Sequence, residues 1–289
     1  MNDAAAQRRF YAEEIRITSN IESKSLVDAL AAVPRDRFLP PGPWIIRGEA
    51  DFQAPPRQTP DADPRHVHHN IAVGIDPGRM LFNGAPGLVA RMIDLLALQQ
   101  GSRVLHVGTG LGYYTALIAH CVGERGRVLG IEVDADLAAA ARTNLSDYGA
   151  VEVRQGNGAE PVDECFDAVL VNAGVTHPLP SWLDALLPGG RMILPITAAG
   201  MMPNIGKGLL ILVTNTGKGA RLPARTAGFV AIYSALQLRD QNINARLGEA
   251  MAKSPFVAIR SLRRDAHEPE SSCWLHTQGC CFSLAEAEA

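Results

Sequence analysis

Short apolar runs alternate with helix-length segments along the middle of this chain. Four of these runs predict strands: Arg103–Val107, Val128–Ile131, Ala168–Val171 and Met192–Pro195. Between them lie three segments with helical character: Tyr113–Val122, Asp134–Tyr148 and Leu179–Leu187. Such alternation predicts an α/β fold, with a mostly parallel, doubly wound sheet that carries helices on both faces. Two further apolar runs, Leu209–Val213 and Gly228–Leu236, are expected to complete that sheet.

The two ends of the chain show different patterns. Residues 1–40 predict helices that end at Pro34, and a further helix is expected to begin at Pro86 and reach about Leu98. Residues 40–80 between them are rich in Pro, Gly, Asp and His, which predicts a long loop that is either a functional lid or partly disordered. Beyond Gln237, one helix-like segment precedes a polar stretch.

These boundaries predict three parts. They are residues 1–100, with helices and a long loop that closes over the substrate; residues 101–236, a Rossmann-like cofactor domain; and residues 237–289, a C-terminal extension.

Composition narrows the class of protein. The 289 residues include 27 basic and 30 acidic ones, a balance that gives no reason to expect a nucleic-acid or membrane-surface partner. No apolar run has the length of a membrane span, and the first residues lack the apolar core of a signal peptide. The five scattered cysteines indicate free thiols in a reducing cytoplasm. The sequence does not indicate an oligomeric state.

A glycine-rich loop follows the first predicted strand. Gly108, Gly110 and Gly112 form G-x-G-x-G, whereas dinucleotide-binding loops have G-x-G-x-x-G, and Tyr113 stands where the last glycine of that pattern is needed. Glu132 closes the second predicted strand, where a carboxylate can accept hydrogen bonds from both ribose hydroxyls of an adenosine. Loop and acid together favour S-adenosylmethionine, which has a ribose and no phosphate, over NAD.

Ligands of open parallel sheets bind beyond the carboxyl ends of the strands. That rule gathers four segments of this chain around one expected cofactor: the loop Gly108–Gly112, Glu132, Asn157-Gly158 and Asn172.

Three segments resemble the protein-L-isoaspartate O-methyltransferases. They are Val33-Pro-Arg-Asp-Arg-Phe-Leu-Pro40, the glycine loop with its flanking strands, and Phe166–Pro180 with its continuation Leu187–Pro195. By eye, the resemblance extends over roughly residues 25–235. It implies a Rossmann-like methyltransferase fold and S-adenosylmethionine as the methyl donor.

The resemblance also implies roles for individual residues. Gly108 and Gly110 would line the methionine and ribose of the cofactor, Glu132 would hold the ribose, and Asn157-Gly158 would contact the adenine. The cofactor site is expected to include five further residues: His106, Thr109, Gly112, Val133 and Asn172.

The chain departs from the family in two places. His106 stands where the family usually has an acid, and Arg79–Pro86 replaces a Gly-Gln-Thr-Ile-Ser-Gln-Pro-like segment, so the family's hydroxyl side chains are missing. Asn83 is the nearest polar side chain and is our candidate catalytic residue. Ala85, Pro86 and His177 are the candidate substrate contacts.

The leading hypothesis is an O-methyltransferase that acts on an isoaspartyl or aspartyl carboxylate of a peptide or protein. A carboxylate is ionised at neutral pH and needs no general base, whereas a hydroxyl or amine acceptor would, and the candidates for that base are His66, His68, His69 and His177. Two alternatives stay open: a small-metabolite hydroxyl or carboxylate as the acceptor, and a non-catalytic cofactor-binding module.

No metal site is predicted. His66-x-His68-His69 has no acid or cysteine at helical spacing, and Cys273-x-x-His276-x-x-x-Cys280-Cys281 lacks a convincing second pair of ligands.

Overall fold

The structure is a computed structural model that describes residues 4–48, 55–199, 204–277 and 279–287. It divides into two compact units, Met1–Ser102 with Thr109–Gln155 and Arg103–Gly108 with Gly156–Ala289. These units differ from the three predicted parts, because the N-terminal helices pack with helices that follow the glycine loop. The chain passes from the second unit to the first between Gly108 and Thr109, inside that loop.

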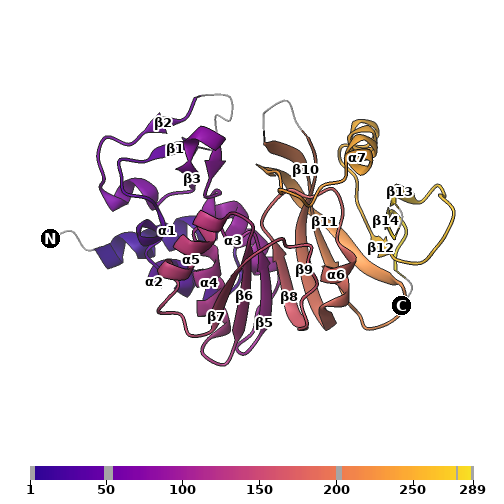
Figure 1. Ribbon diagram of the computed structural model, residues 1–289, viewed down its shortest axis with the longest axis horizontal. Helices are drawn as coiled ribbons and strands as arrows, with labels where there is room; N and C mark the ends of the chain where they lie inside the picture. The colour runs from indigo at the N-terminus through magenta and orange to yellow at the C-terminus, as the bar shows by residue number, and fades with distance from the viewer. Residues whose placement is uncertain (1–3, 49–54, 200–203, 278, 288–289) are drawn as a thin grey trace. The chain divides into compact units, whose positions relative to one another are not determined.

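The first unit contains most of the helices (Figure 1). Its α-helices are α1 (Ala4–Thr18), α2 (Lys24–Ala32), α3 (Pro86–Leu95), α4 (Tyr113–Val122) and α5 (Ala135–Asn144), and its short 3₁₀ helices are η1 (Arg35–Phe38), η2 (Pro64–Val67) and η3 (Pro77–Arg79). Its strands are β1 (Ile45–Gly48), β2 (Arg57–Gln58), β3 (Ile71–Asp76), β4 (Leu81–Phe82), β6 (Arg127–Glu132) and β7 (Val151–Gln155).

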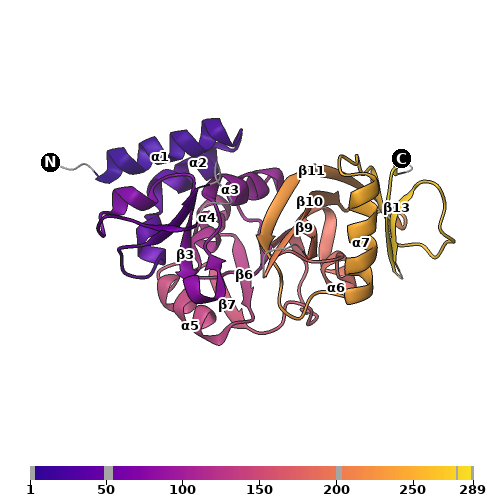
Figure 2. The same ribbon diagram turned by 90° about the horizontal axis from the view of Figure 1, so that it is seen from above.

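Local signals explain where these helices begin and end. The Ser23 side chain accepts a hydrogen bond from the Leu26 N–H at the start of α2, and Pro34 follows its end. The apolar face of α2, which includes Leu26 and Leu30, is buried against α1 and α4, and Figure 2 shows α1 and α2 side by side. Strands β6 and β7 pair in parallel, and α5 packs on both of them.

Strands β1 to β4 form a small antiparallel sheet with the order β2-β1-β3-β4. Its core contains Trp44, Ile46, Val67 and Val73. The interpretation of residues 40–80 as a long loop is therefore wrong for the part that the structure describes, and residues 49–54 lie outside it. The pattern missed this sheet because β2 and β4 have only two residues each, too few to show an alternation.

The second unit is built on a long sheet. Its strands are β5 (Arg103–Val107), β8 (Phe166–Val171), β9 (Leu186–Ala199), β10 (Ile205–Thr214), β11 (Arg221–Tyr233), β12 (Ser261–Arg263), β13 (Cys273–Thr277) and β14 (Cys280–Ser283), and its α-helices are α6 (Pro180–Asp184) and α7 (Gln241–Lys253). The order within this unit is β13-β14-β12-β11-β10-β9-β8-β5.

The sheet of the second unit is mixed. Strands β5, β8 and β9 are parallel, as the alternation of strands and helices predicts, and all further pairs from β9 to β13 are antiparallel. Helices α6 and α7 pack on β9. Within the described residues, no helix combines the length and the apolar character needed to cross a membrane.

Candidate functional site

The glycine loop in the first unit ends at α4. Gly110 and Gly112 have φ values of +54° and +96°, in the region that favours glycine. A Cβ on Gly112 would lie 2.7 Å from Leu145, so this glycine lets the loop pack on the end of α5. A Cβ on Gly110 would meet nothing within 4 Å, and the main chain at Gly110 is therefore open to a ligand.

Glu132 lies at the carboxyl end of β6, beside this open stretch. One of its carboxylate oxygens accepts the Gly110 N–H at 2.8 Å, and the other accepts the Asp134 N–H at 3.1 Å. Burial raises the pKa of Glu132, and the two N–H groups oppose that rise. A buried carboxylate has free lone pairs after these two bonds, so it can accept two more hydrogen bonds from hydroxyl groups of a ligand.

Thr109 and Val133 flank these residues. Thr109 is buried, and its methyl group occupies the space beside Gly130 where a Cβ would stand. Val133 connects Glu132 to Asp134, the N-cap of α5. Asp134 also pairs with Arg79 of η3 at 2.7 Å, which ties the small antiparallel sheet to the end of β6.

In the second unit, His106, Gly108 and Asn172 lie at the ends of two paired strands. The Asn172 N–H donates to Val107 O at 2.8 Å, which continues the β5–β8 pairing past its last residues. Gly108 has a φ of +85°, and its carbonyl accepts from Asn172 Nδ2 at 3.5 Å. His106 is fully buried within β5, where it pairs with Leu170. The His106 side chain is therefore part of the packed interior around β5.

The buried His106 predicts an acid-sensitive fold. Burial lowers its pKa to about 3, so the unfolded chain takes up this proton well before the folded chain does. The stability that neutral His106 contributes is complete above its unfolded pKa of about 6.5 and is lost as the pH falls from there towards 3. Between pH 7 and pH 5 we expect a loss of about 2 kcal/mol in the free energy of unfolding.

Denaturant unfolding at the two pH values measures this loss. In His106→Leu the loss in the free energy of unfolding between pH 7 and pH 5 should vanish. The same loss should persist in His120→Gln, a substitution on the exposed face of α4. An equal pH dependence in His106→Leu and in the wild type would contradict the assignment.

Asn157 and Gly158 form a turn in the second unit. The Asn157 side chain accepts the Ala159 N–H at 3.0 Å and donates to Gln237 Oε1 at 3.2 Å. The Gly158 carbonyl accepts from Trp182 Nε1 at 2.7 Å, and a Cβ on Gly158 would lie 2.6 Å from Val107. Glycine is therefore required for the close approach of this turn to the end of β5.

Asn83, Ala85 and Pro86 connect the small sheet to α3 in the first unit. Asn83 is 8% exposed, its N–H donates to Val73 O at 2.7 Å, and its Nδ2 has no hydrogen-bond partner among the residues that the structure describes. An unpaired buried amide is unfavourable by about 1–3 kcal/mol, which marks Asn83 as a candidate ligand contact. Ala85 is the N-cap of α3, and Pro86 is its first residue.

Arg35 holds this connection in place, a role that the sequence pattern does not show. Its fully buried guanidinium donates to the carbonyls of five residues: Val67, His69, Ile71, Asn83 and Gly84. Arg35 lies in the segment Val33–Pro40 that carries the family resemblance, and its position there was the available signal.

The remaining histidines are dispersed. His66, His68 and His69 each lie beside a different carboxylate, at 2.9 to 3.6 Å, and not around a common centre. His177, in the second unit, is half-buried and shares a hydrogen bond of 2.9 Å with Thr176 Oγ1. Burial lowers the pKa of His177, so its ring is neutral at pH 7.

Comparisons with known proteins decide the family. The family model for protein-L-isoaspartate(D-aspartate) O-methyltransferase matches residues 59–207, more than half of the chain. This chain belongs to that family. The protein-L-isoaspartate O-methyltransferase 2 of Anaeromyxobacter sp. is 32% identical over 74% of this chain and 78% of its own length. The Aeropyrum pernix protein-L-isoaspartate O-methyltransferase is 35% identical over 64% of each chain.

Solved structures show the same fold. One protein-L-isoaspartate O-methyltransferase matches 85% of this chain and 69% of its own, with a TM-score of 0.62 and 21% identity. A Plasmodium falciparum protein described as a beta-aspartate methyltransferase, in complex with S-adenosyl-L-homocysteine, matches 80% of this chain and 98% of its own, with a TM-score of 0.58 and 18% identity.

These matches confirm the predicted family and the Rossmann-like methyltransferase fold. This isoaspartate methyltransferase family member is an S-adenosylmethionine-dependent methyltransferase, as the sequence predicts. The residues of the first unit fit that cofactor, because the main chain at Gly110 is open and the adjacent Glu132 carboxylate has acceptor capacity left. The individual cofactor contacts of all ten candidate residues stay predictions: His106, Gly108, Thr109, Gly110, Gly112, Glu132, Val133, Asn157, Gly158 and Asn172.

Proposed function

We propose that this chain methylates the side-chain carboxylate of an isoaspartyl residue in a peptide or protein. The match to the family model carries this assignment, and the buried Glu132 carboxylate beside the open main chain at Gly110 supports the methyl donor that the reaction needs. Glu132 can accept hydrogen bonds from ribose hydroxyls, and the glycine loop lacks the pattern that binds a pyrophosphate. Both features suit S-adenosylmethionine. The five cysteines, all free, accord with our prediction of a cytoplasmic enzyme.

Methyl transfer to a carboxylate requires no general base from the side chains of the protein. When bound, S-adenosylmethionine supplies a methyl group that its positively charged sulfur has already activated. The acceptor carboxylate is ionised at neutral pH, because its usual pKa is about 4, and so no side chain has to remove a proton from it. The residues of the chain therefore act by holding the acceptor in line and by excluding water.

We assign the orientation of the acceptor to Asn83. Its Nδ2 is a buried donor with no partner in the described part of the chain, and such a donor suits a carboxylate oxygen. Main-chain contacts hold this residue in place, since its N–H donates to Val73 and its carbonyl accepts from Arg35. In this proposal, Asn83 replaces the hydroxyl groups that the family usually carries in this segment as the hydrogen-bond donor to the acceptor carboxylate.

Replacing Asn83 tests this assignment. In Asn83→Ala, kcat/KM for an isoaspartyl peptide should fall by about 10- to 100-fold, because a hydrogen bond to a charged group contributes about 1.5–3 kcal/mol. Asn83→Asp keeps the size of the side chain but places a negative charge near the acceptor, so its loss should be larger. Steady-state kinetics measures both, and the Kd for S-adenosyl-L-homocysteine should stay unchanged. Equal kcat/KM values in all three proteins would refute the assignment.

The acceptor itself is tested with matched peptides. An isoaspartyl peptide, its aspartyl counterpart of the same sequence and a set of small carboxylic acids are incubated with S-adenosylmethionine, and methyl addition is followed by mass spectrometry. We expect methylation of the isoaspartyl peptide. Methylation of a small acid alone would support the small-molecule alternative, and cofactor binding without any transfer would support a binding module.

One observation favours the small-molecule alternative. His177 is half-buried, neutral at pH 7 and hydrogen-bonded to Thr176, which suits a general base for a hydroxyl acceptor. If a hydroxyl is the acceptor, His177→Gln abolishes transfer, whereas a carboxylate acceptor leaves the rate nearly unchanged.

A further inference from the structure

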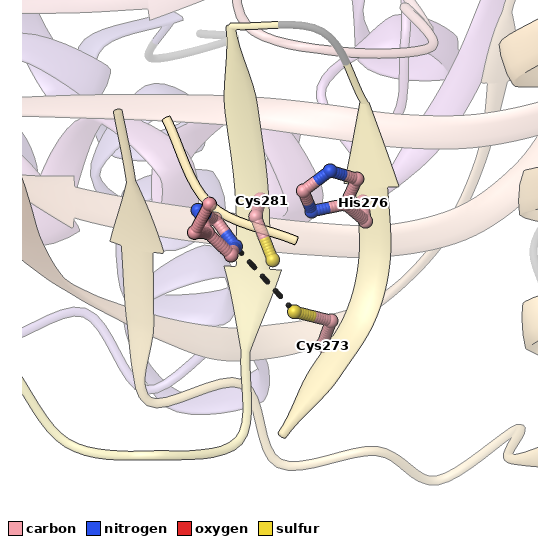
Figure 3. Close-up of side chains that lie close together, drawn as sticks. Cys273, His276 and Cys281 are labelled. Carbon is pink, nitrogen blue, oxygen red and sulfur yellow. Dashed lines mark hydrogen bonds between the residues drawn. The ribbon is translucent and has the colours of Figure 1, made fainter. Parts of the chain in front are cut away.

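Four metal-ligating side chains converge at the C-terminal strands of the second unit. They belong to His267, Cys273, His276 and Cys281, and one ligand atom of each lies within 4.8 Å of every other. Figure 3 shows Cys273 and His276 on one strand with Cys281 on its neighbour, their side chains pointing toward one another. We propose that these four residues bind a structural Zn²⁺ ion.

A β-bulge places two of the ligands on one face. Residues three apart in a regular strand point to opposite faces, so a regular β13 would separate Cys273 from His276. The pairing of β13 with β14 shifts register between Cys273 and Leu275, and this shift returns both side chains to the same face. His276 is paired directly with Cys281, which adds the third ligand from β14.

The distance between Cys273 Sγ and His267 Nε2 suits a tetrahedral ion. Zinc–sulfur bonds of about 2.3 Å and zinc–nitrogen bonds of about 2.0–2.1 Å place neighbouring ligand atoms roughly 3.4–3.8 Å apart. Cys273 Sγ lies 3.5 Å from His267 Nε2. The rings of His267 and His276 are nearly perpendicular, at 88°, with centroids 4.7 Å apart, so both imidazoles lie beside the cluster.

The surrounding contacts prepare the ligand atoms for a metal. His267 Nδ1 lies 2.9 Å from the Asp265 carbonyl and donates to it, so in the neutral ring Nε2 is the atom left to bind a metal. The Glu270 N–H donates to Cys273 Sγ at 3.4 Å, a contact that favours a thiolate. His276 Nδ1 is buried and has no hydrogen-bond partner among the described residues.

The donor set selects the ion and the kind of site. Two thiolates and two imidazoles favour zinc over the oxygen-binding Mg²⁺ and Ca²⁺. Four protein ligands complete a tetrahedron and leave no open position for a substrate, so the site is structural. An ion here would tie the β13–β14 hairpin to the segment that leads out of β12, where Arg263 is already held by Asp265 and Glu270.

His267 completes a ligand set that the sequence pattern does not show. The pattern from Cys273 to Cys281 lacks a second pair of ligands because its fourth member comes from six residues upstream of Cys273, in the segment between β12 and β13. Cys280, although adjacent to Cys281, contacts Thr277 and is not in the cluster.

Metal content tests the proposal on the full-length chain. The wild type, purified from zinc-supplemented cells, should contain about one zinc ion per chain, as measured by inductively coupled plasma mass spectrometry. Cys273→Ser and His267→Gln should hold less than about a tenth of that amount. The control variants Cys280→Ser and Cys165→Ser, which remove a buried and an exposed thiol outside the cluster, should keep the full amount.

A spectroscopic measurement on the wild type covers the case in which a variant does not fold. Cobalt(II) in place of zinc should give the intense visible bands of a tetrahedral site together with thiolate-to-cobalt charge transfer. A wild type that contains no zinc, or a weak octahedral cobalt spectrum, would overturn the proposal. So would a Cys273–Cys281 disulfide that persists in the presence of excess zinc.

Discussion

Replacing Glu132 with glutamine is expected to raise the Kd for S-adenosylmethionine and S-adenosyl-L-homocysteine by about 10- to 100-fold. The amide keeps one oxygen for Gly110 or Asp134 but loses the charge and the acceptor capacity that ribose hydroxyls require. Isothermal titration calorimetry measures both constants. The free energy of unfolding should fall by about 1–3 kcal/mol, because the amide NH2 cannot accept from the second of these two N–H groups.

Glu152→Gln is the matched control. Glu152 lies on β7, the strand paired with β6, but its exposed carboxylate pairs with Arg127 and Arg154 rather than with the glycine loop. Its cofactor Kd should equal that of the wild type. An unchanged Kd in Glu132→Gln would remove the central support for the proposed site.

Replacing Arg35 with methionine is expected to lower the free energy of unfolding by about 3–5 kcal/mol. Methionine fills a similar volume but leaves the carbonyls of five residues, from Val67 to Gly84, without their shared donor in a buried place. Denaturant unfolding measures the loss. Hydrogen exchange should rise across residues 67–84, which include Asn83, and methylation should fall with it.

Two further variants serve as controls for the expected loss in the free energy of unfolding. Arg37→Met, an exposed position two residues away, should change the free energy of unfolding by less than about 0.5 kcal/mol. Arg35→Lys should recover only part of the stability, because an ammonium group lacks the planar fork that reaches carbonyls on several sides. A loss below about 1 kcal/mol in Arg35→Met would show that the carbonyls find other donors.

Strong periodicity made much of the fold predictable. Strand β5 and helix α4 have the predicted bounds, and β6, β8, β9 and β10 contain the predicted strands. Strand β11 ends at Tyr233, three residues before the predicted end at Leu236. Strand β7 and the strands β12–β14 do not follow from the pattern, because their apolar positions are few and their segments short. The predicted helix Leu179–Leu187 ends early at Asp184, since β9 begins at Leu186.

Some residues of the candidate site are likewise predictable from the sequence, and others are not. Gly110, Gly112 and Glu132 are recognisable from spacing, because a tight turn and a strand-ending acid are local requirements. The role of Arg35 is not recognisable, since the carbonyls it binds come from residues 32 to 49 positions away in the sequence.

The sequence by itself determined the family, the cofactor and the alternation of strands and helices, because these depend on motifs of a few neighbouring residues. Only the tertiary structure revealed the small sheet around Trp44, the hydrogen bond from Arg35 to the Asn83 carbonyl and the convergence of His267 with Cys273, His276 and Cys281. The physical reason is that burial and ligand convergence depend on contacts between segments distant along the chain, and a register shift of one residue in β13 decides which side chains meet.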